Sequence, residues 1–331
     1  MKDSSFKEKI VNVNQELWKK RTRPIPELMA EFGLTYDSVK SRLRRMTLNN
    51  GPIDGSRVIE SAADDVLMSS PPFQGKLNKT GLTKVIVLPD MQVPYQNDHA
   101  LRVVEQYMAD HTWDYYINIG DFIDVDGISH FNKGNFRNKI GKELIKEYKV
   151  ANRILDRHQE IVRKNNKNAK FHLIFGNHEE RVERYLDEHP DMAGFIEVPI
   201  NLKLLERGFT WTRDGHMGKS IQLGKAQFTH GLKIGVSHTV AMAREWGDNI
   251  FYGHTHDVQS YTHTTRHKDS TRIAQSLGCL CVYDLPYVQT TPTRWQNAFA
   301  VFYFRPDGTF NHYMINIVND EFISPEGKLY V

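Results

Sequence analysis

The sequence predicts an α/β fold in which two β-sheets form a sandwich flanked by helices, with a small all-α domain at the N-terminus. From residue 83 onward, short runs rich in β-branched and aromatic residues alternate with amphipathic helical patterns. Several of the later runs alternate apolar and polar residues, as antiparallel strands do. Residues 1–48 instead show helical periodicity and are rich in Lys and Arg.

The N-terminal residues predict a helix-turn-helix module over residues 1–48. Residues 26–32 form a short helical pattern that a glycine ends, and a second helix is expected over residues 36–46. Two short helices joined by a turn that contains glycine are typical of a helix-turn-helix. Ala30 and Val39 are expected at packing positions between the helices.

The positive charge of the chain is concentrated in this module. Residues 1–48 hold eleven Lys or Arg and six Asp or Glu, a net charge of +5, while the whole chain carries +3. A basic module favours a polyanionic partner, and we expect a nucleic acid, DNA in the first place. The alternative is a helical packing or dimerisation module whose basic face is only solvated. The side chains expected to reach phosphates are Lys40, Arg42, Arg44 and Arg45.

Residues 49–82 are predicted to be a linker, because Gly, Pro, Asn and Ser recur there in turn-forming pairs. The main domain is then expected over residues 83–331. Its predicted helices cover residues 97–110, 138–164, 179–188 and 239–246. Its predicted strands cover residues 85–88, 115–119, 171–175, 219–223, 226–229, 249–252, 260–264, 271–280, 298–304 and 312–317.

Five of these strands are followed at once by polar stretches: Asp90-Met91-Gln92, Gly120–Asp124, Gly176–Glu179, His230-Gly231 and Gly253–His256. Open α/β sheets bind ligands beyond the carboxyl ends of their strands, so we expect these stretches to meet. Imidazoles and carboxylates together suit Zn, Mn or Fe. The candidate ligands are too many for one tetrahedral ion and suit two ions that share a carboxylate: Asp90, Gln92, Asp121, Asn177, His230, His254 and His256.

In these stretches the chain resembles the calcineurin-like metallophosphoesterase family. The pattern of that family runs Asp-x-His, Gly-Asp-x-x-Asp, Gly-Asn-His-Glu, His and Gly-His-x-His, in this order. The resemblance covers about residues 83–313 and implies the two-sheet sandwich flanked by helices. A helix-turn-helix at the N-terminus and Asp-x-Gln in the first motif look like features of phage or bacterial members.

The resemblance also implies a role for each matching residue. His178 would protonate the leaving oxygen as a general acid. Asp124 would orient His178 or another histidine. The remaining roles are metal ligation: Asp90, Gln92 and His256 at a first metal, Asn177, His230 and His254 at a second, and Asp121 bridging both.

The chain departs from the family pattern at two positions. Gln92 stands where a histidine is usual, and its carbonyl oxygen is a weaker and harder donor than imidazole. We therefore expect Mn²⁺, with Mg²⁺, Fe and Zn²⁺ as alternatives. Val125 stands where protein Ser/Thr phosphatases of this family carry an arginine, which disfavours a phosphoprotein substrate. Glu180 and Arg181 are expected to form the solvated start of a helix.

Together these expectations describe a dinuclear-metal-dependent phosphoesterase that hydrolyses nucleic-acid phosphodiesters through a metal-bridging hydroxide, as a DNA nuclease or end-processing enzyme. One alternative is a phosphatase or phosphodiesterase of small nucleotides or phosphoproteins. Another is a DNA-binding regulator whose phosphoesterase domain is inert.

Cysteine usage and hydropathy predict the surroundings of the protein. Cys279 and Cys281 lie one residue apart, too close for a disulfide within a strand, and are expected to be free thiols in a reducing compartment. No stretch approaches the ~20 apolar residues of a membrane span, and the first residues lack an apolar signal sequence. We expect a cytoplasmic protein without membrane contact. The oligomeric state is left open.

Overall fold

The computed structural model describes residues 17, 19, 20, 22–32, 39, 43, 70–128, 136–213, 215–264, 266, 271–285, 288 and 294–331. The chain divides into two compact units, residues 1–69 and residues 70–331. This division falls inside the predicted linker, so the last part of that linker belongs to the larger unit.

In the smaller unit, helix α2 spans Ile25–Phe32, where the sequence predicts a helix. Leu28 is buried in a cluster with Leu17 and Val39. Val39 therefore packs as predicted, but Ala30 is exposed, because two residues along a helix turn a side chain to nearly the opposite face. The predicted phosphate-contacting residues, together with most of the predicted second helix, lie outside the described residues: Lys40, Arg42, Arg44 and Arg45.

The larger unit contains a six-stranded sheet with the strand order β11-β10-β1-β2-β3-β4. Strands β1 to β4 run parallel, β10 pairs antiparallel with β1, and β11 pairs antiparallel with β10 at the edge of the sheet. The strands are β1 Thr83–Leu88, β2 Tyr115–Asn118, β3 Lys170–Ile174, β4 Phe209–Thr212, β10 Ala298–Phe304 and β11 Phe310–Asn316.

A second, five-stranded sheet has the order β5-β6-β7-β9-β8. Its central strands β6, β7 and β9 run parallel. The strands are β5 Ile221–Leu223, β6 Ala226–Thr229, β7 Ile250–Tyr252, β8 Ser260–His263 and β9 Arg272–Ser276. A small hairpin, β12 Phe322–Ile323 with β13 Leu329–Tyr330, follows near the C-terminus.

The two sheets share an apolar core between them. In β1, Val85 belongs to this core while Ile86 belongs to the core under the helices, because successive strand residues point to opposite faces. The ring of Phe302 lies edge-on to Phe228 and Phe251 of the second sheet, with centroids 5.0 and 4.7 Å apart. Both faces of the first sheet are therefore buried, which explains its continuous apolar runs.

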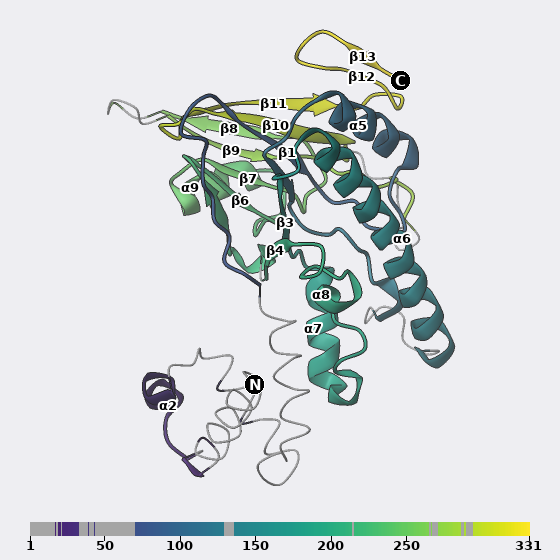
Figure 1. The fold of residues 1–331 in the computed structure, drawn as a ribbon, viewed down its shortest axis with the longest axis vertical. Helices are drawn as coiled ribbons and strands as arrows, with labels where there is room; N and C mark the ends of the chain where they lie inside the picture. Colours follow the sequence, from purple (N-terminus) through teal and green to yellow (C-terminus); the bar gives the residue numbers. More distant parts are fainter. Residues whose placement is uncertain are drawn as a thin grey trace. The chain divides into compact units, whose positions relative to one another are not determined.

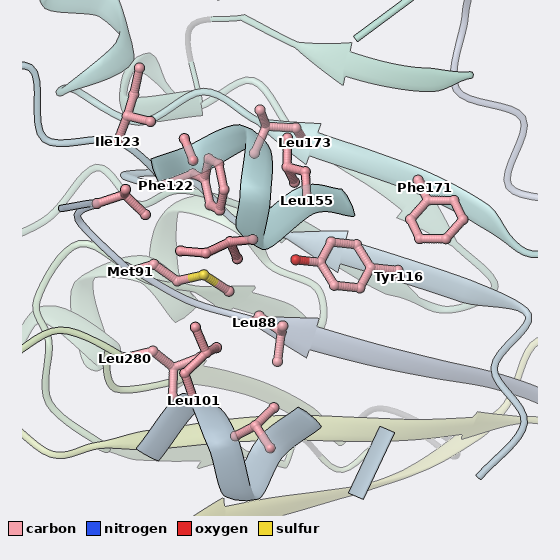
Figure 2. Packing of buried hydrophobic residues seen from close by; sticks show 14 of the residues in the cluster. Leu88, Met91, Leu101, Tyr116, Phe122, Ile123, Leu155, Phe171, Leu173 and Leu280 are labelled. Carbon is pink, nitrogen blue, oxygen red and sulfur yellow. The ribbon is translucent and has the colours of Figure 1, made fainter. Parts of the chain in front are cut away.

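Helices cover the outer face of each sheet, and Figure 1 shows α5 and α6 on one side and α9 on the other. On the α5 and α6 side, Leu101 and Leu155 pack with Tyr116 of β2 (Figure 2). On the other side, Met242 of α9 packs with Tyr252 of β7. The helices are α5 Asp98–Asp110, α6 Phe136–Asn165, α7 Glu179–Glu188, α8 Val198–Asn201 and α9 His238–Trp246.

This arrangement confirms the predicted α/β fold with two sheets between helices. Strand β4 was not predicted, because its alternating pattern is only four residues long and follows a stretch without clear periodicity. Strand β9 ends at Ser276, before the predicted end at residue 280, because Gly278 adopts a left-handed φ of 77°. None of the helices in the described part of the chain combines the length and the apolar character needed to cross a membrane.

Residues 70–82 lie against the larger unit instead of forming part of a free linker. Phe73 and Leu77 pack against the core between the sheets. The hydroxyl of Tyr115 accepts a hydrogen bond from the N–H of Lys76 at 2.9 Å and lies 3.0 Å from the carbonyl oxygen of Gln74. Two apolar anchors and a buried tyrosine therefore fix this segment, although its composition is that of a loop.

Candidate metal centre

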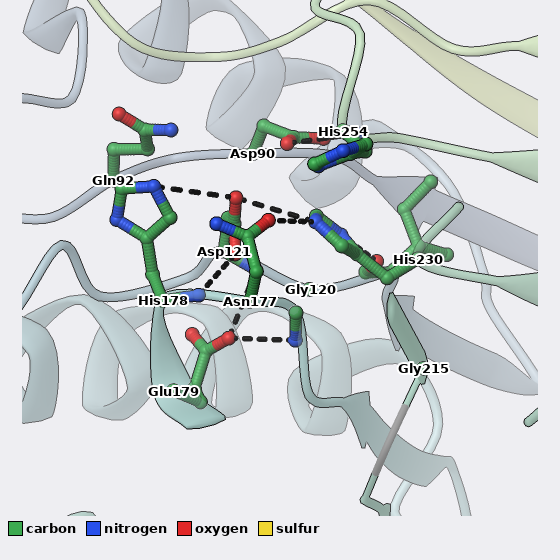
Figure 3. Close-up of polar contacts among 12 residues, drawn as sticks. Asp90, Gln92, Gly120, Asp121, Asn177, His178, Glu179, Gly215, His230 and His254 are labelled. Atoms are coloured by element: carbon green, nitrogen blue, oxygen red, sulfur yellow. Dashed lines mark hydrogen bonds and ion pairs between the residues drawn. The ribbon is translucent and has the colours of Figure 1, made fainter. Parts of the chain in front are cut away.

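The five predicted polar stretches all follow the carboxyl ends of parallel strands. Within each sheet, parallel pairing brings these ends to one edge, and the facing of the two sheets brings the two edges together. Figure 3 shows the resulting group, with Asp121 between His178 and His230 and with Asn177 beside it. The strand ends and their residues are β1 with Asp90 and Gln92, β2 with Asp121, β3 with Asn177, β6 with His230, and β7 with His254 and His256.

Hydrogen bonds between neighbouring loops hold these stretches in register. The backbone N–H of Gln92 donates to the carbonyl oxygen of Asp121 at 2.9 Å, which joins the first two loops. The carboxylate of Asp90 accepts from the backbone N–H of His254 at 3.0 and 3.1 Å, which joins the first loop to the fifth. The N–H of His178 donates to Oδ1 of Asp121 at 2.9 Å. The loops therefore form one connected assembly.

Glu179, to which the sequence analysis gave no role, stabilises two of these loops. Its buried carboxylate accepts hydrogen bonds from the N–H groups of Asp121 and Ile123, both at 3.0 Å, and of Gly176 at 2.8 Å. Burial, and then the nearby Asp121 carboxylate, raise the pKa of Glu179 to about 7, although the backbone donors act in the opposite direction. The sequence signal was present, since Glu179 closes the third motif, but its three partners are visible only in the fold.

Several loop residues adopt left-handed backbone conformations that side chains other than glycine rarely take. Each such residue costs about 1–3 kcal/mol and persists only where surrounding contacts determine it. Strain of this kind concentrates at functional sites. The residues, with φ between 31° and 70°, are Asp90, Gln92, Asp121, Val125, His254 and His256.

Two glycines allow the carboxylates to approach the backbone. A Cβ atom added to Gly176 would overlap the side chain of Asp121, and one added to Gly253 would overlap the side chain of Asp90. These two positions therefore require glycine for space, which explains why glycine opens both the third and the fifth motif.

One group of donor atoms forms around His230. Its Nδ1 lies 3.0 Å from the carbonyl oxygen of Ile119, an obligate acceptor, so Nδ1 carries a proton. In the neutral ring Nε2 then presents a lone pair, and it lies 3.2 Å from Oδ2 of Asp121 and 3.2 Å from Oδ1 of Asn177. Electron pairs from three side chains face one point, an arrangement that a cation satisfies. The ring of His254 adds a fourth side chain, with its centroid 5.0 Å from that of His230.

A second group forms around His256. Its Nε2 lies 3.2 Å from Oδ1 of Asp90 and 3.1 Å from Nε2 of Gln92. The amide nitrogen of Gln92 thus faces the place where its oxygen was predicted to bind a metal. Rotation of this amide by 180° would present the oxygen instead, and the two orientations differ only in which hydrogen bonds they make.

The two groups share one carboxylate. Ligand atoms of Asp121, His230 and His254 lie within 4.8 Å of one another, and so do those of Asp90, Asp121 and His256. Nitrogen and oxygen donors of this kind suit Mn, Fe or Zn, and a shared carboxylate suits a pair of ions. The residues present therefore fit two divalent cations with Asp121 between them.

The titration of these groups shows how strongly the site attracts positive charge. Burial lowers the pKa of His230, but the Asp121 carboxylate outweighs it and raises the pKa to about 9. Burial also lowers the pKa of His256, but the hydrogen bond to Asp90 outweighs burial and raises this pKa to about 10. Burial and the neighbouring His230 instead lower the pKa of His254 to about 4. His254 is therefore a neutral imidazole, the form that binds metals.

His178 and Asp124 lie together, as the sequence analysis expected. Nδ1 of His178 is 2.8 Å from Oδ1 of Asp124 and 2.9 Å from its carbonyl oxygen, and Nε2 lies 3.6 Å from Oδ2 of Asp121. Burial lowers the pKa of His178, but the carboxylates of Asp121 and Asp124 raise it above its ordinary value overall. An imidazole held in this way can carry a proton beside the shared carboxylate.

The expectation of a solvated first turn after His178 was wrong. Glu180 is buried, and Arg181 is half-buried with hydrogen bonds to the carbonyl oxygen of Asp124 and to Nε2 of His178. Residues three apart on a helix lie on one face, so the side of α7 that carries Arg181 turns toward the site. Periodicity alone could not reveal this, because it does not show what the first turn of the helix packs against.

Cys279 and Cys281 are free and buried, as expected. Sγ of Cys281 lies 3.7 Å from Nδ1 of His256, the nitrogen that faces away from Asp90. Partners on the second nitrogen of a metal-binding histidine fix its tautomer and orientation. This contact could not be predicted from the sequence, because residues 257–278 separate the thiols from the histidine along the chain.

The fold and this arrangement define an α/β protein with a candidate two-cation site at the carboxyl edges of its sheets. No family model and no curated protein matches the chain. Solved structures match weakly. Vacuolar protein sorting 29 from Cryptosporidium parvum shares 14% identity over 72% of this chain and 98% of its own, with a TM-score of 0.35.

Two enzymes are also among the matching structures. The nuclease MPE of Pseudomonas putida shares 14% identity over 66% of this chain and 82% of its own, with a TM-score of 0.28. The purple acid phosphatase PPD1 of yellow lupin shares 12% identity over 74% of this chain and 55% of its own, with a TM-score of 0.33. Because these TM-scores lie below 0.5, the function of this chain is inferred below from its own residues.

Proposed function

We propose that the protein is a divalent-cation-dependent phosphoesterase that hydrolyses nucleic-acid phosphodiesters. The observation that carries this proposal is the position of Asp121, whose carboxylate belongs to two groups of ligand atoms at once. Two cations that share a carboxylate can bind both the attacking and the leaving oxygen of a phosphoryl displacement. The fold supports the same conclusion, because the five loops come from two sheets and contact one another directly.

Cations in such a pair supply Lewis acidity and make water a nucleophile near neutral pH. The side chains of this protein would divide the remaining work. His178, held by Asp124, would keep a proton on Nε2 and deliver it to the leaving oxygen. One cation would be held by Asp90, Gln92 and His256. The other would be held by Asn177, His230 and His254. The carboxylate of Asp121 would contribute to both.

The reaction is a hydrolysis and balances without any further reagent. A bond forms between the oxygen of water and phosphorus, and the bond between phosphorus and the leaving oxygen breaks. The leaving oxygen takes the proton of His178, and a proton from water restores the imidazolium. The products are a phosphate monoester and an alcohol. General acid catalysis of this kind contributes about 10²–10⁴-fold to the rate.

Mn²⁺ is the metal that we propose for this site. The amide oxygen of Gln92 is a harder donor than the imidazole that the family resemblance leads one to expect, and hard donors favour Mn²⁺ or Mg²⁺ over Zn²⁺. The imidazoles at His230, His254 and His256 favour Mn²⁺ over Mg²⁺, since Mg²⁺ prefers oxygen ligands.

The proposed substrate follows from the charge of the N-terminal residues. A net charge of +5 over residues 1–48 favours binding to a polyanion, and binding to DNA phosphates falls steeply with salt as counterions are released. Deletion of residues 1–48 should therefore weaken DNA binding and reduce its dependence on salt. Hydrolysis of a small ester should stay the same, because residues 70–331 form a compact unit that contains the site.

The test incubates the full chain and Mn²⁺ with single-stranded DNA, with double-stranded DNA and with bis(p-nitrophenyl) phosphate. Cleavage of DNA and of the aryl ester is the expected result. Cleavage of the aryl ester alone would favour a small-molecule phosphodiesterase. Cleavage of neither would contradict the proposal and leave a DNA-binding regulator with an inert phosphoesterase domain. If DNA binding depended equally on salt before and after deletion of residues 1–48, the proposed role of that module in DNA binding would be wrong.

A further inference from the structure

The guanidinium group of Arg181 lies beside the proposed proton donor. Arg181 is on the first turn of α7, three residues after His178, and its side chain is half-buried. Nη2 lies 3.1 Å from Nε2 of His178, and Nη1 donates to the carbonyl oxygen of Asp124 at 3.1 Å. A cation that cannot lose its proton is therefore held within one hydrogen bond of the nitrogen that must face the leaving oxygen.

Hydrogen-bond chemistry fixes the direction of this contact. A guanidinium group only donates, so Nε2 of His178 is the acceptor. Nδ1 faces two acceptors, the side-chain and backbone oxygens of Asp124, at 2.8 and 2.9 Å, and must carry the ring proton. In this arrangement Arg181 contacts the nitrogen that the proposed reaction places beside the leaving oxygen.

A phosphate group would change this contact. A phosphate oxygen carries a negative charge that an imidazole nitrogen lacks, and arginine matches two phosphate oxygens in a planar fork. A phosphate beside Asp121 would lie close to His178, whose Nε2 is 3.6 Å from Oδ2 of that carboxylate. The phosphate would therefore compete with the imidazole nitrogen for Arg181, and the charged oxygen is the stronger acceptor.

Two residues near Arg181 are less suited to contact a phosphate at this place. Val125, where protein phosphatases of the resembled family carry an arginine, is buried and apolar. Arg184, one turn further along α7, is exposed and lies 3.4 Å from the carbonyl oxygen of Asn177, so it faces the backbone of the third loop.

We propose that Arg181 binds a non-bridging oxygen of the scissile phosphate in exchange for its contact with Nε2 of His178. This inference rests on the proposed phosphoesterase function and adds a substrate-binding residue to it.

The test compares Arg181→Gln and Arg181→Lys with the matched control Arg157→Gln. Arg157 is exposed on α6 and pairs with Glu105 at 2.8 Å. Its substitution therefore changes the net charge by the same amount on a different helix. Three quantities are measured on the full chain: Mn²⁺ affinity by isothermal titration, affinity of the Mn²⁺-loaded protein for inorganic phosphate, and kcat and KM for bis(p-nitrophenyl) phosphate.

Arg181→Gln should weaken phosphate binding by about 10-fold or more, the loss of one hydrogen bond to a charged group, and should lower kcat as well as raise KM. Mn²⁺ affinity should change by less than about 3-fold, Arg181→Lys should recover part of the phosphate affinity, and the control should match the wild type. Unchanged phosphate affinity in Arg181→Gln, beside an active wild type, would refute the inference alone. Joint loss of Mn²⁺ and phosphate binding would make Arg181 a structural tether and refute it too. A wild type that hydrolyses no ester would refute the proposed function and this inference with it.

Discussion

Asp257 offers the sharpest test of how the fold positions the candidate metal ligands of the fifth loop. This residue directly follows His256, and its carboxylate is buried. Oδ1 accepts hydrogen bonds from the hydroxyls of Thr255 at 2.7 Å and Ser276 at 3.0 Å, and Oδ2 lies 3.0 Å from Nε2 of His238. Burial raises the pKa of Asp257, but these partners, His238 first, lower it below its ordinary value overall.

Replacing Asp257 with alanine removes all three bonds. A hydrogen bond to a charged group contributes about 1.5–3 kcal/mol, and the three are not additive because they share one acceptor group. We expect the free energy of unfolding to fall by about 3–4 kcal/mol. Asp257→Asn should cost less, about 1 kcal/mol. Its oxygen can keep both hydroxyls, and His238 can move its proton to Nδ1 and donate to the Tyr252 hydroxyl, which lies 2.7 Å away.

The assay is urea unfolding at pH 7.5, with Asp156→Ala as the control. Asp156 also forms a short ion pair, 2.6 Å from Arg207, but is exposed, so its loss should cost less than about 1 kcal/mol. Mn²⁺ affinity should fall in Asp257→Ala, because the same bonds hold the loop that carries His254 and His256. Equal losses for Asp257→Ala and Asp156→Ala would refute the reasoning, as would unchanged Mn²⁺ affinity in a folded Asp257→Ala protein.

Three further outcomes are expected. Gln92→His should tighten Mn²⁺ binding at the first position by about 10-fold, the scale on which single groups tune metal sites; an unchanged titration would remove the argument from the amide donor. His178→Asn should keep Mn²⁺ affinity and lower kcat for an alkyl-ester leaving group by at least about 10²-fold, and an unaltered kcat would contradict the general-acid role. His172 is buried, and burial lowers its pKa to about 3, so between pH 6.5 and 3 the unfolded chain binds a proton that the folded chain does not. Its contribution should make stability fall by up to about 1.4 kcal/mol per pH unit as the pH decreases through this window; equal pH slopes for the wild type and His172→Gln in urea unfolding would contradict it.

The sequence predicted those parts of the fold whose causes are local. Helix α7 was predicted at its observed bounds, Glu179–Glu188, because its helical pattern lies between a strand end and Pro190. Strands β1, β2 and β3 were found because burial on both faces makes their residues almost uniformly apolar. Strand β4 was missed because the alternation over Phe209–Thr212 is too short to be decisive, and pairing with β3 fixes its place in the sheet.

In the candidate site, too, some features could be predicted from the sequence and others depend on contacts made only in the fold. Motif order was enough to gather the ligand residues, since each follows a strand and strand ends converge in this class of fold. The supporting contacts could not be read from the chain. Glu179 contacts N–H groups up to 58 residues away, and Cys281 contacts a histidine 25 residues away. Arg181 was assigned to solvent because a helical pattern does not identify its neighbours. The left-handed backbone at Asp90 and Asp121 is likewise imposed by the contacts of the folded state.

The most direct test of this account is anomalous diffraction from crystals of the protein grown with Mn²⁺. We expect two Mn²⁺ peaks about 3.5–4 Å apart, with the Asp121 carboxylate between them, one beside Asp90 and His256 and the other beside Asn177 and His230. Peaks elsewhere on the molecule, or a lone peak that Asp121 does not contact, would contradict the shared-carboxylate site on which the proposed chemistry depends.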